Sequence, residues 1–328
     1  MAYNIATTGV GAVVGYGVIR SIRNSKKLKR SRIIGIDNNP HAVGFFKCDG
    51  HYTISRVSSP DYIDSLIDIC KKEAVDVLIP NIEDELLPIH DHMRRFTEAG
   101  IKVVIQPRQV IEVYGDKYLT SIHLKKLGIA TPDTCLFTPS NGEKIAEMVN
   151  SFGLPLILKP RYGRSSKGIL LAETTKQLNA YMDALEGREY IVQEYLGGGD
   201  REYTCAVFKV PSMVEPYTIL LKRQLSNGMT ISAEVVHDDT LTDLCRDIAD
   251  KVPIEGSLNV QAMVRDGVPY VFEINTRYSS TTYMRAKCGF NDVQMGIDYF
   301  LHGRIDRPPR IKEYRIARFW EEIFISGN

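Results

Sequence analysis

The stretch GSLNVQAMVRDGVPYVFEINTRYSST, residues 256–281, carries the clearest structural signal in this chain. Two apolar runs, 258–264 and 270–275, are separated by a short polar segment that contains Asp266 and Gly267. An Asp-Gly pair between strand-like runs is typical of a tight hairpin turn. The sequence therefore predicts two antiparallel strands here.

Three polar side chains of the second strand are expected on one face, because alternate residues of a strand share a face: Glu273, Asn275 and Arg277. Phe272 and Ile274 should then point into the core, and Gln261 of the first strand should lie beside the polar face. Magnesium takes oxygen ligands and keeps waters and substrate phosphates. We expect Gln261, Glu273 and Asn275 to form a magnesium site, with Arg277 neutralising a transferred phosphoryl group. A polar strand face exposed to solvent is the alternative.

A second candidate segment, KPRYGRSSKG at residues 159–168, lies between two apolar runs. Glycines, hydroxyls and cations in one loop suit a polyphosphate, because backbone N–H groups can close on it while Lys159 supplies charge from a strand. The candidate phosphate contacts in this segment are Lys159, Ser165, Ser166 and Gly168. A solvated hairpin loop is the alternative.

Further along the chain, the apolar run 190–196 leads directly into three glycines, 197–199, and then Glu202. Exposed backbone groups at the end of such a strand can bind a purine edge, and Glu202 can accept hydrogen bonds from ribose hydroxyls. The alternatives are an ordinary loop and a salt-bridged strand residue.

The first third of the chain alternates apolar strand runs with helical patterns, which predicts a parallel sheet covered by helices up to about residue 110. One long helix is expected over 83–99. The short strands between about 156 and 236 have links too short for crossover helices, so antiparallel pairing is expected.

Gly9, Gly11 and Gly15, with Asp37 after the second strand, partly match a dinucleotide-binding fingerprint. The third glycine is expected at position 14, where Val14 stands. Such a loop also serves to turn a strand tightly into a helix. A nicotinamide-dependent oxidoreductase therefore stays an alternative function.

Composition excludes several classes of function. In 328 residues, 41 Lys and Arg balance 40 Asp and Glu, so no global charge favours nucleic acid or an anionic membrane. The basic cluster at 20–32 fits a solvated helix end. The six cysteines are scattered and fit reduced thiols, and no stretch fits a signal peptide or a membrane span of about 18 apolar residues. We expect a cytoplasmic protein.

These motifs resemble the ATP-grasp superfamily, and most closely the synthetase units of the large chain of carbamoyl-phosphate synthetase. The most specific parts are GSLNVQ at 256–261 and VFEINTRYSST at 271–281. The resemblance implies mixed α/β and α+β architecture in three parts. Residues 1–110 would form a parallel-sheet pre-ATP-grasp domain, and 111–190 and 191–328 the N- and C-terminal ATP-grasp subdomains with antiparallel sheets.

The resemblance also implies roles for individual residues. Gln261, Glu273 and Asn275 would hold magnesium, which manganese could replace, and Arg277 would contact the phosphates and an acyl-phosphate. The remaining implied contacts are to ATP: Lys117 and Lys159 to phosphates, Glu194, Tyr195 and Leu196 to adenine, and Glu202 to ribose.

The chain departs from the carbamoyl-phosphate synthetases in two ways. Its loop 161–168 has Ser165, Ser166 and Lys167 where glycines are expected, and it has one ATP-grasp unit where carbamoyl-phosphate synthesis uses two. A single unit fits better a ligase that activates a small carboxylate as an acyl-phosphate for attack by an amine or a thiol. A non-catalytic ATP-binding protein is a further alternative.

Candidate substrate residues are Ser279 and Arg285, where hydroxyls and a guanidinium could capture a carboxylate, and Glu83, beside Asn81 and Asp84. Helix capping and an ordinary helix start explain the same residues. The expected partners are small molecules, with no nucleic acid or membrane; a homo-oligomer is compatible with the sequence.

Overall fold

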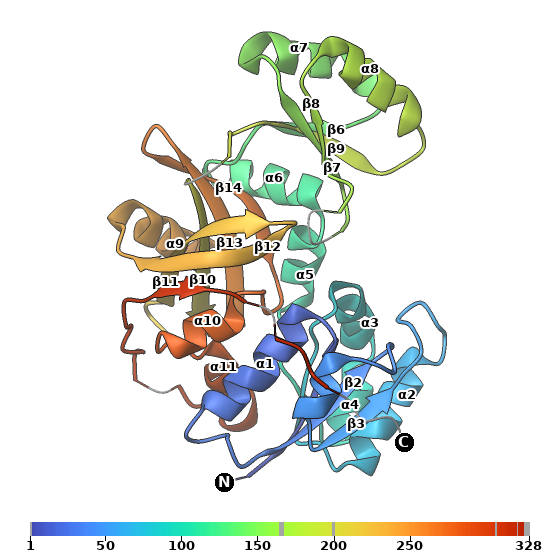
Figure 1. Ribbon diagram of the computed structural model, residues 1–328, viewed down its shortest axis with the longest axis vertical. Helices are drawn as coiled ribbons and strands as arrows, with labels where there is room; N and C mark the ends of the chain where they lie inside the picture. Colours follow the sequence, from blue (N-terminus) through green and yellow to red (C-terminus); the bar gives the residue numbers. More distant parts are fainter. Residues whose placement is uncertain (1, 164–166, 199–200, 306, 320, 325–328) are drawn as a thin grey trace.

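The computed structural model describes residues 2–163, 167–198, 201–305, 307–319 and 321–324. Three sheets organise this part of the chain (Figure 1). A parallel sheet comes first, a small antiparallel sheet lies at the far end of the molecule, and a larger antiparallel sheet lies between them. The expected combination of α/β and α+β architecture is confirmed.

The first sheet has the order β3-β2-β1-β4-β5, and all its pairs are parallel. Its strands are β1 (Asn4–Thr8), β2 (Arg32–Asp37), β3 (Gly50–Thr53), β4 (Val77–Ile79) and β5 (Lys102–Val103). Its helices are α1 (Val13–Asn24), α2 (Tyr62–Lys72), α3 (Leu86–Asp91), α4 (Met93–Glu98) and α5 (Arg108–Tyr114), with 3-10 turns η1 (Val43–Lys47) and η2 (Glu83–Glu85).

The single helix expected over 83–99 is wrong, because the chain breaks it into η2, α3 and α4. The break before α4 has a local cause. The His92 ring nitrogen Nδ1 lies 2.9 Å from the carbonyl oxygen of Pro88, which would accept the N–H of residue 92 in a continuous helix. The His92 N–H bonds to Ile89 instead.

A fully buried carboxylate ties this domain together where β1 and β4 end. Glu85 accepts hydrogen bonds from the Thr8 and Tyr62 hydroxyls and from the backbone N–H groups of Asn81 and Ile82, the latter two at 2.9 Å. Burial raises the pKa of Glu85, and these donors offset part of that shift. The turn after β4 is thereby fixed in place.

The second sheet is antiparallel, with the order β6-β9-β7-β8. Its elements are β6 (Thr134–Leu136), β7 (Leu156–Pro160), β8 (Leu170–Ala172), β9 (Tyr190–Glu194), η3 (Pro139–Asn141), α7 (Gly142–Phe152) and α8 (Thr175–Ala184). The two ATP-grasp subdomains are expected to divide between residues 190 and 191. In the structure β9 pairs with β6 and β7, so this strand belongs to the second sheet and the sheets divide after it.

The third sheet has the order β14-β13-β10-β11-β12-β15 and is antiparallel throughout. Its strands are β10 (Glu202–Lys209), β11 (Tyr217–Ser226), β12 (Met229–Val236), β13 (Gly256–Arg265), β14 (Val268–Asn275) and β15 (Arg315–Ala317). One face packs on α9 (Asp239–Lys251), α5 and α6 (Lys117–Lys126). The other face packs partly on α10 (Thr282–Lys287) and α11 (Asp292–His302), and the rest of it faces the candidate site.

The hairpin β13–β14 is confirmed. Asp266 and Gly267 both have positive φ, 52° and 78°, as a two-residue hairpin turn of this type requires. The six cysteines are unpaired. Within the residues described, no helix is long and apolar enough to cross a membrane.

Candidate functional site

The polar face expected on β14 is present. Gln261 lies opposite Glu273, and Asn259 lies opposite Asn275, so four oxygen-bearing side chains of β13 and β14 share one face of the third sheet. Ile274 points the other way and is buried in the core, as expected.

Phe272 differs from the expectation that it points into the core. The pairing of β13 with β14 shifts between Gln261 and Ala262, which leaves Phe272 as the extra residue of a bulge. Its ring lies against the second sheet, with its centroid 5.1 Å from Nζ of Lys159 on β7. Through the bulge, Phe272 contacts Lys159 at the end of β7, next to the polar face of β14.

Lys159 is the buried cation of this junction. Its Nζ donates to Oε1 of Gln193 at 2.8 Å, and Gln193 donates in turn to the Thr134 hydroxyl at 2.9 Å. The pKa of Lys159 is lowered to about 8, chiefly by burial and in smaller part by Lys117, while Glu273 and Glu202 act in the opposite direction. Four charged side chains that the sequence nominated therefore converge between the second and third sheets.

Lys117 begins α6 and connects it to the phosphate loop. Asp116 caps the helix by accepting the N–H groups of Tyr118 and Leu119, and the Lys117 Nζ donates to the Gly163 carbonyl at 2.7 Å. Ser165 and Ser166 lie outside the described residues. Gly168 has φ +75°, and a Cβ there would lie 2.8 Å from the Tyr190 hydroxyl, so the loop needs a glycine at that position.

Arg223 is a site residue that the sequence did not reveal. From β11 it contacts Oε1 of Glu202 at 2.5 Å and Oε1 of Gln261 at 2.6 Å. The proposed ribose acceptor and one proposed metal ligand are thus held by one nearly buried guanidinium. In sequence, Arg223 sits in the strand run ILLKRQL, and only the register of β10, β11 and β13 brings it beside Glu202 and Gln261.

The proposed adenine-binding segment follows β9. The Glu194 carboxylate is buried and engaged, because it pairs with Arg265 at 2.5 Å and accepts the Asp133 N–H at 3.3 Å. Leu196 is buried and Tyr195 is half-buried. Any contact from this segment to a purine would therefore come from its backbone rather than from the Glu194 side chain.

Arg277 links the polar face to the first domain. Its Nη2 lies 3.6 Å from Oε2 of Glu83, and its Nη1 donates to the Tyr278 carbonyl at 2.8 Å. Two residues nominated for separate reasons, Arg277 for phosphoryl transfer and Glu83 for substrate, are neighbours in the structure.

Comparisons with known proteins show the family of this chain. A model of the ATP-grasp domain matches residues 114–281, and a model of the PylC-like N-terminal domain matches residues 16–104. The chain belongs to the ATP-grasp family.

The ATP-grasp chain resembles several curated proteins at low identity. It is 24% identical over 309 residues to the carbamoyl phosphate synthase large chain of Thermomicrobium roseum, covering 84% of this chain and 28% of that one. It is 22% identical over 335 residues to the C-terminal section of the large chain from Methanocaldococcus jannaschii, covering 97% and 53%. The chain thus spans about a quarter to half the length of these relatives.

Solved structures share the ATP-grasp fold. N5-carboxyaminoimidazole synthetase from Staphylococcus aureus, complexed with ADP, superposes with a TM-score of 0.76 at 15% identity and covers 97% of this chain and 82% of that one. The biotin carboxylase domain of Hydrogenobacter thermophilus 2-oxoglutarate carboxylase gives 0.71 at 16%, covering 94% and 71%. At these identities the likeness establishes the fold.

The donor set suits the magnesium that ATP-grasp enzymes use. Among the residues described, no group of three or more His, Cys, Asp or Glu side chains could hold a metal. One carboxylate with amide oxygens is enough for magnesium, whose remaining positions go to water and phosphate. Nδ2 of Asn275 is buried and has no hydrogen-bond partner among the residues described, so this amide is not committed to a donor contact within the sheet. Gln261 could join only by releasing Arg223.

Arg285 is placed differently from the substrate-binding role expected of it. It is 1% exposed, and it pairs with Asp292, which is 0% exposed, at 2.5 Å. Its Nη1 donates to Oγ of Ser279 at 2.8 Å, so the nominated serine serves the same buried network. A buried pair of this kind orders the segment after β14 rather than presenting a free guanidinium.

The glycine loop after β1 is explained without a dinucleotide. The two Asp37 carboxylate oxygens accept backbone N–H groups, one from Gly11 at 2.7 Å and one from Asn39 at 2.9 Å. A Cβ on Gly15 would lie 2.4 Å from the Gly9 carbonyl oxygen. The glycines allow a tight strand-to-helix turn, and Asp37 closes that turn.

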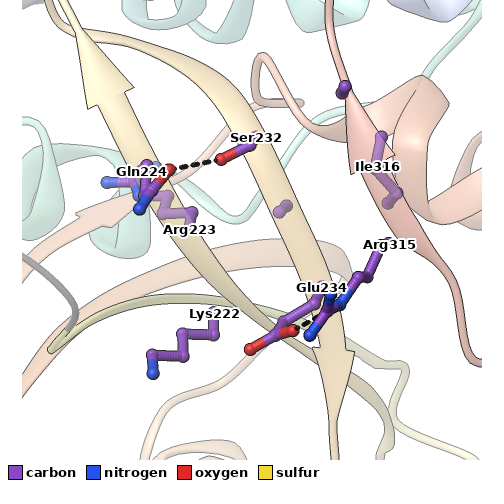
Figure 2. Close-up of a pocket in the computed structure, with 9 residues that line it drawn as sticks. Lys222, Arg223, Gln224, Ser232, Glu234, Arg315 and Ile316 are labelled. Carbon is purple, nitrogen blue, oxygen red and sulfur yellow. Dashed lines mark hydrogen bonds and ion pairs between the residues drawn. The ribbon is translucent and has the colours of Figure 1, made fainter.

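A cavity of about 490 Å³ lies where β11, β12 and β15 meet. Figure 2 shows its lining, in which Gln224 bonds to Ser232 and Arg315 pairs with Glu234. Neighbours along a strand point to opposite faces, so Gln224 lies on the face away from Glu202 and Gln261. Of the described residues that line the cavity, Arg223 alone belongs to the candidate site, and its side chain points to the other face.

The lowered pKa of Lys159 predicts a pH effect on nucleotide use. A lysine with a pKa of about 8 is charged below that pH and loses its charge as the pH rises through it. If Lys159 holds phosphates, kcat/KM for Mg-ATP should be constant from about pH 6.5 to 7.5 and fall above about pH 8, because kcat/KM reports groups of the free enzyme. Steady-state kinetics between pH 6.5 and 9.5 measures this, and a flat profile would argue against the assignment.

Proposed function

We propose that this chain is an ATP-dependent ligase that activates a small carboxylate as an acyl-phosphate and joins it to an amine or a thiol. The observation that carries the proposal is the convergence of Lys117, Lys159, Glu202 and Glu273 between the second and third sheets. Arg277 lies two residues beyond Asn275, where β14 ends, and its guanidinium is 3.6 Å from Glu83. Membership of the ATP-grasp family supports ATP-dependent ligation in general.

Each group has a role in binding ATP. Lys117 and Lys159 would neutralise the phosphates, Glu202 would accept the ribose hydroxyls, and the backbone at Glu194 to Leu196 would bind the adenine edge. Glu273 and Asn275 would hold magnesium, with Gln261 as a third ligand if Arg223 releases it. Bound magnesium would supply charge that stabilises the transferring phosphoryl group.

Catalysis would rest on positioning and charge, without a covalent enzyme intermediate. A carboxylate oxygen of the substrate attacks the γ-phosphorus of ATP, the bond to the bridging oxygen breaks, and ADP leaves. The product is a mixed anhydride of the carboxylate and phosphate. The nucleophile then attacks the acyl carbon, and inorganic phosphate leaves with the oxygen that joined carbon to phosphorus. Arg277 would contact the phosphoryl group in the first step and the departing phosphate in the second.

Relatives of known activity support a single-unit ligase. D-alanine–D-alanine ligase A of Bacillus cereus is 27% identical over 180 residues, covering 49% of this chain and 56% of that protein. Its name describes a ligase that joins a carboxylate to an amine. We propose small-molecule substrates of these two kinds, no nucleic acid partner, and a homo-oligomer as an assembly compatible with the fold.

ADP release from ATP, magnesium and panels of carboxylates and amines tests this function. We expect turnover that depends on magnesium and on one carboxylate, with the joined product visible by mass spectrometry. ATP binding without carboxylate-stimulated turnover would instead indicate a non-catalytic nucleotide-binding protein. Thermal stabilisation by NAD or NADP and not by Mg-ATP would indicate an oxidoreductase.

A further inference from the structure

The C-terminal segment crosses back over the third sheet after α11. β15 pairs with β12 and forms one edge of the sheet, and the Arg318 N–H donates to the Ile231 carbonyl at 2.7 Å just beyond it. In Figure 1 this segment then passes α1 on its way toward the first domain. It lies outside the two regions that the family models match, 16–104 and 114–281.

The Arg318 side chain turns in toward the segment that follows β14. Its Nη2 donates to the Ser280 carbonyl at 2.5 Å. Its Nη1 is shielded from water and has no hydrogen-bond acceptor among the residues described. A shielded guanidinium N–H without an acceptor is unfavourable, because its hydrogen bonds to water are lost and no protein acceptor replaces them.

A second guanidinium reaches the same turn from α1. Cζ of Arg20 lies 3.7 Å from the ring centroid of Tyr283 and 5.7 Å from that of Tyr16. Tyr283 is three residues beyond Ser280, so Arg20 and Arg318 approach one turn of the chain from two directions. Burial lowers the pKa of Arg318, and Arg20 lowers it further.

No carboxylate neutralises this pair. Across the described parts of the chain, neither guanidinium has an ion-pair partner, whereas Arg161, Arg223, Arg265 and Arg285 each pair with a carboxylate. Arg20 is exposed to solvent and repels the Arg318 charge, and an anion bound near both would relieve that repulsion. Guanidinium groups match carboxylate and phosphate oxygens in both charge and geometry.

The pair lies close to the centre of the proposed chemistry. Ser280, which Arg318 contacts, is three residues from Arg277, and three residues of chain span at most about 10 Å. The backbone of Ser280, which Arg318 contacts, therefore lies within the length of a small molecule from the backbone of Arg277.

We propose that Arg20 and Arg318 form a subsite for a second anionic group, a carboxylate or a phosphate, on the substrate whose reacting carboxylate lies at Arg277. This inference rests on the proposed function and narrows the substrate to one class. The class is carboxylates that carry a second anionic group on the same molecule, separated from the reacting carboxylate by a short linker. The subsite joins the first domain to the C-terminal segment, so both would have to be in place for the substrate to bind.

Kinetics of Arg20→Met and Arg318→Met test the subsite once a carboxylate that supports ADP release is found. Losing one charge-assisted contact should raise the KM for that carboxylate on the order of 10- to 100-fold while changing kcat less than about 3-fold. The conservative variant Arg318→Lys should recover part of the loss. Arg315→Met is the matched control, because Arg315 lies on the same segment with its side chain 92% exposed, and its KM should stay unchanged.

Substrate analogues give the second comparison. In one analogue, an amide or a hydroxyl replaces the second anion. With the wild-type protein, this analogue should show the same fall in kcat/KM that the intact substrate shows with Arg318→Met. Combining the analogue with Arg318→Met should lower kcat/KM no further, because both changes remove the same contact. Carboxylate and phosphate versions of the analogue tell the two anions apart. Equal use of analogues with and without the second anion would overturn the proposal, as would equal KM changes in Arg318→Met and Arg315→Met.

Inorganic phosphate provides a test that does not need ligase activity. With Mg-ADP present to fill the nucleotide site and ionic strength held constant, phosphate should raise the unfolding temperature of the wild-type protein and of Arg315→Met. It should raise that of Arg20→Met and Arg318→Met less or not at all. A phosphate effect without any carboxylate-dependent turnover would retain the anion site and reject the ligase. Equal phosphate effects in all four proteins would reject the site itself.

Discussion

Glu273→Gln lowers the kcat of magnesium-dependent ATP turnover on the order of 1,000-fold, if this carboxylate holds the metal at the phosphoryl-transfer centre. Glutamine has the same shape and keeps one oxygen, but it removes the only carboxylate of the proposed ligand set. Glu273 lies on a strand opposite Gln261, so an isosteric change should leave the sheet intact. Coupled ADP-release assays across a range of magnesium concentrations measure the loss.

A Glu→Gln change elsewhere separates this effect from a general loss of charge. Glu98→Gln on α4, where the side chain is 60% exposed, should leave kcat unchanged. Added magnesium or manganese should recover little of the activity of Glu273→Gln, because the missing charge also acts on Lys159. A kcat within about threefold of the wild type would show that the metal is held elsewhere.

The buried pair of Arg285 and Asp292 predicts the largest effect on stability. Asp292→Asn should lower the free energy of unfolding by about 3–5 kcal/mol, because it leaves a guanidinium that is 1% exposed without its counter-charge. The Ser257 hydroxyl, which donates to the same Asp292 oxygen at 2.6 Å, would also lose a charged acceptor. Equilibrium unfolding in urea, followed by circular dichroism, measures the change.

An exposed pair provides the comparison. Arg94→Met on α4 breaks an ion pair in which both side chains are more than half exposed, and it should leave the urea midpoint within error of the wild type. If Asp292→Asn unfolds no more easily than Arg94→Met, the pair does not order the segment after β14. Arg285 would then be free for the substrate-binding role that its sequence context suggested.

The hairpin β13–β14 illustrates what local sequence can predict. The positive φ values at Asp266 and Gly267 and the shared face of Glu273 and Asn275 follow from turn chemistry and strand alternation, which depend only on neighbours in the chain. Alternation failed at Phe272, because a bulge adds one residue and reverses the direction of the side chain. Nothing in the sequence marks where a bulge begins.

Arg223 and Arg285 show what depends on pairing between distant segments. Arg223 becomes part of the site because β11 lies beside β10, which brings Glu202 within 2.5 Å, and Gln261 on β13 is then within reach. Arg285 lies near hydroxyls in sequence, as a substrate ligand would, but Asp292 folds back from the start of α11 to pair with it. Charge partners of this kind follow from the fold and not from spacing.

Transfer of isotope from the carboxylate tests the account most directly. A substrate carboxylate with ¹⁸O at both oxygens is incubated with ATP, magnesium, the nucleophile and the protein, and the released phosphate is analysed by mass spectrometry. Formation of an acyl-phosphate predicts one ¹⁸O atom in each phosphate, because the oxygen that attacks phosphorus leaves with it when the acyl carbon accepts the nucleophile. Unlabelled phosphate from a reaction that still forms the joined product would contradict the account.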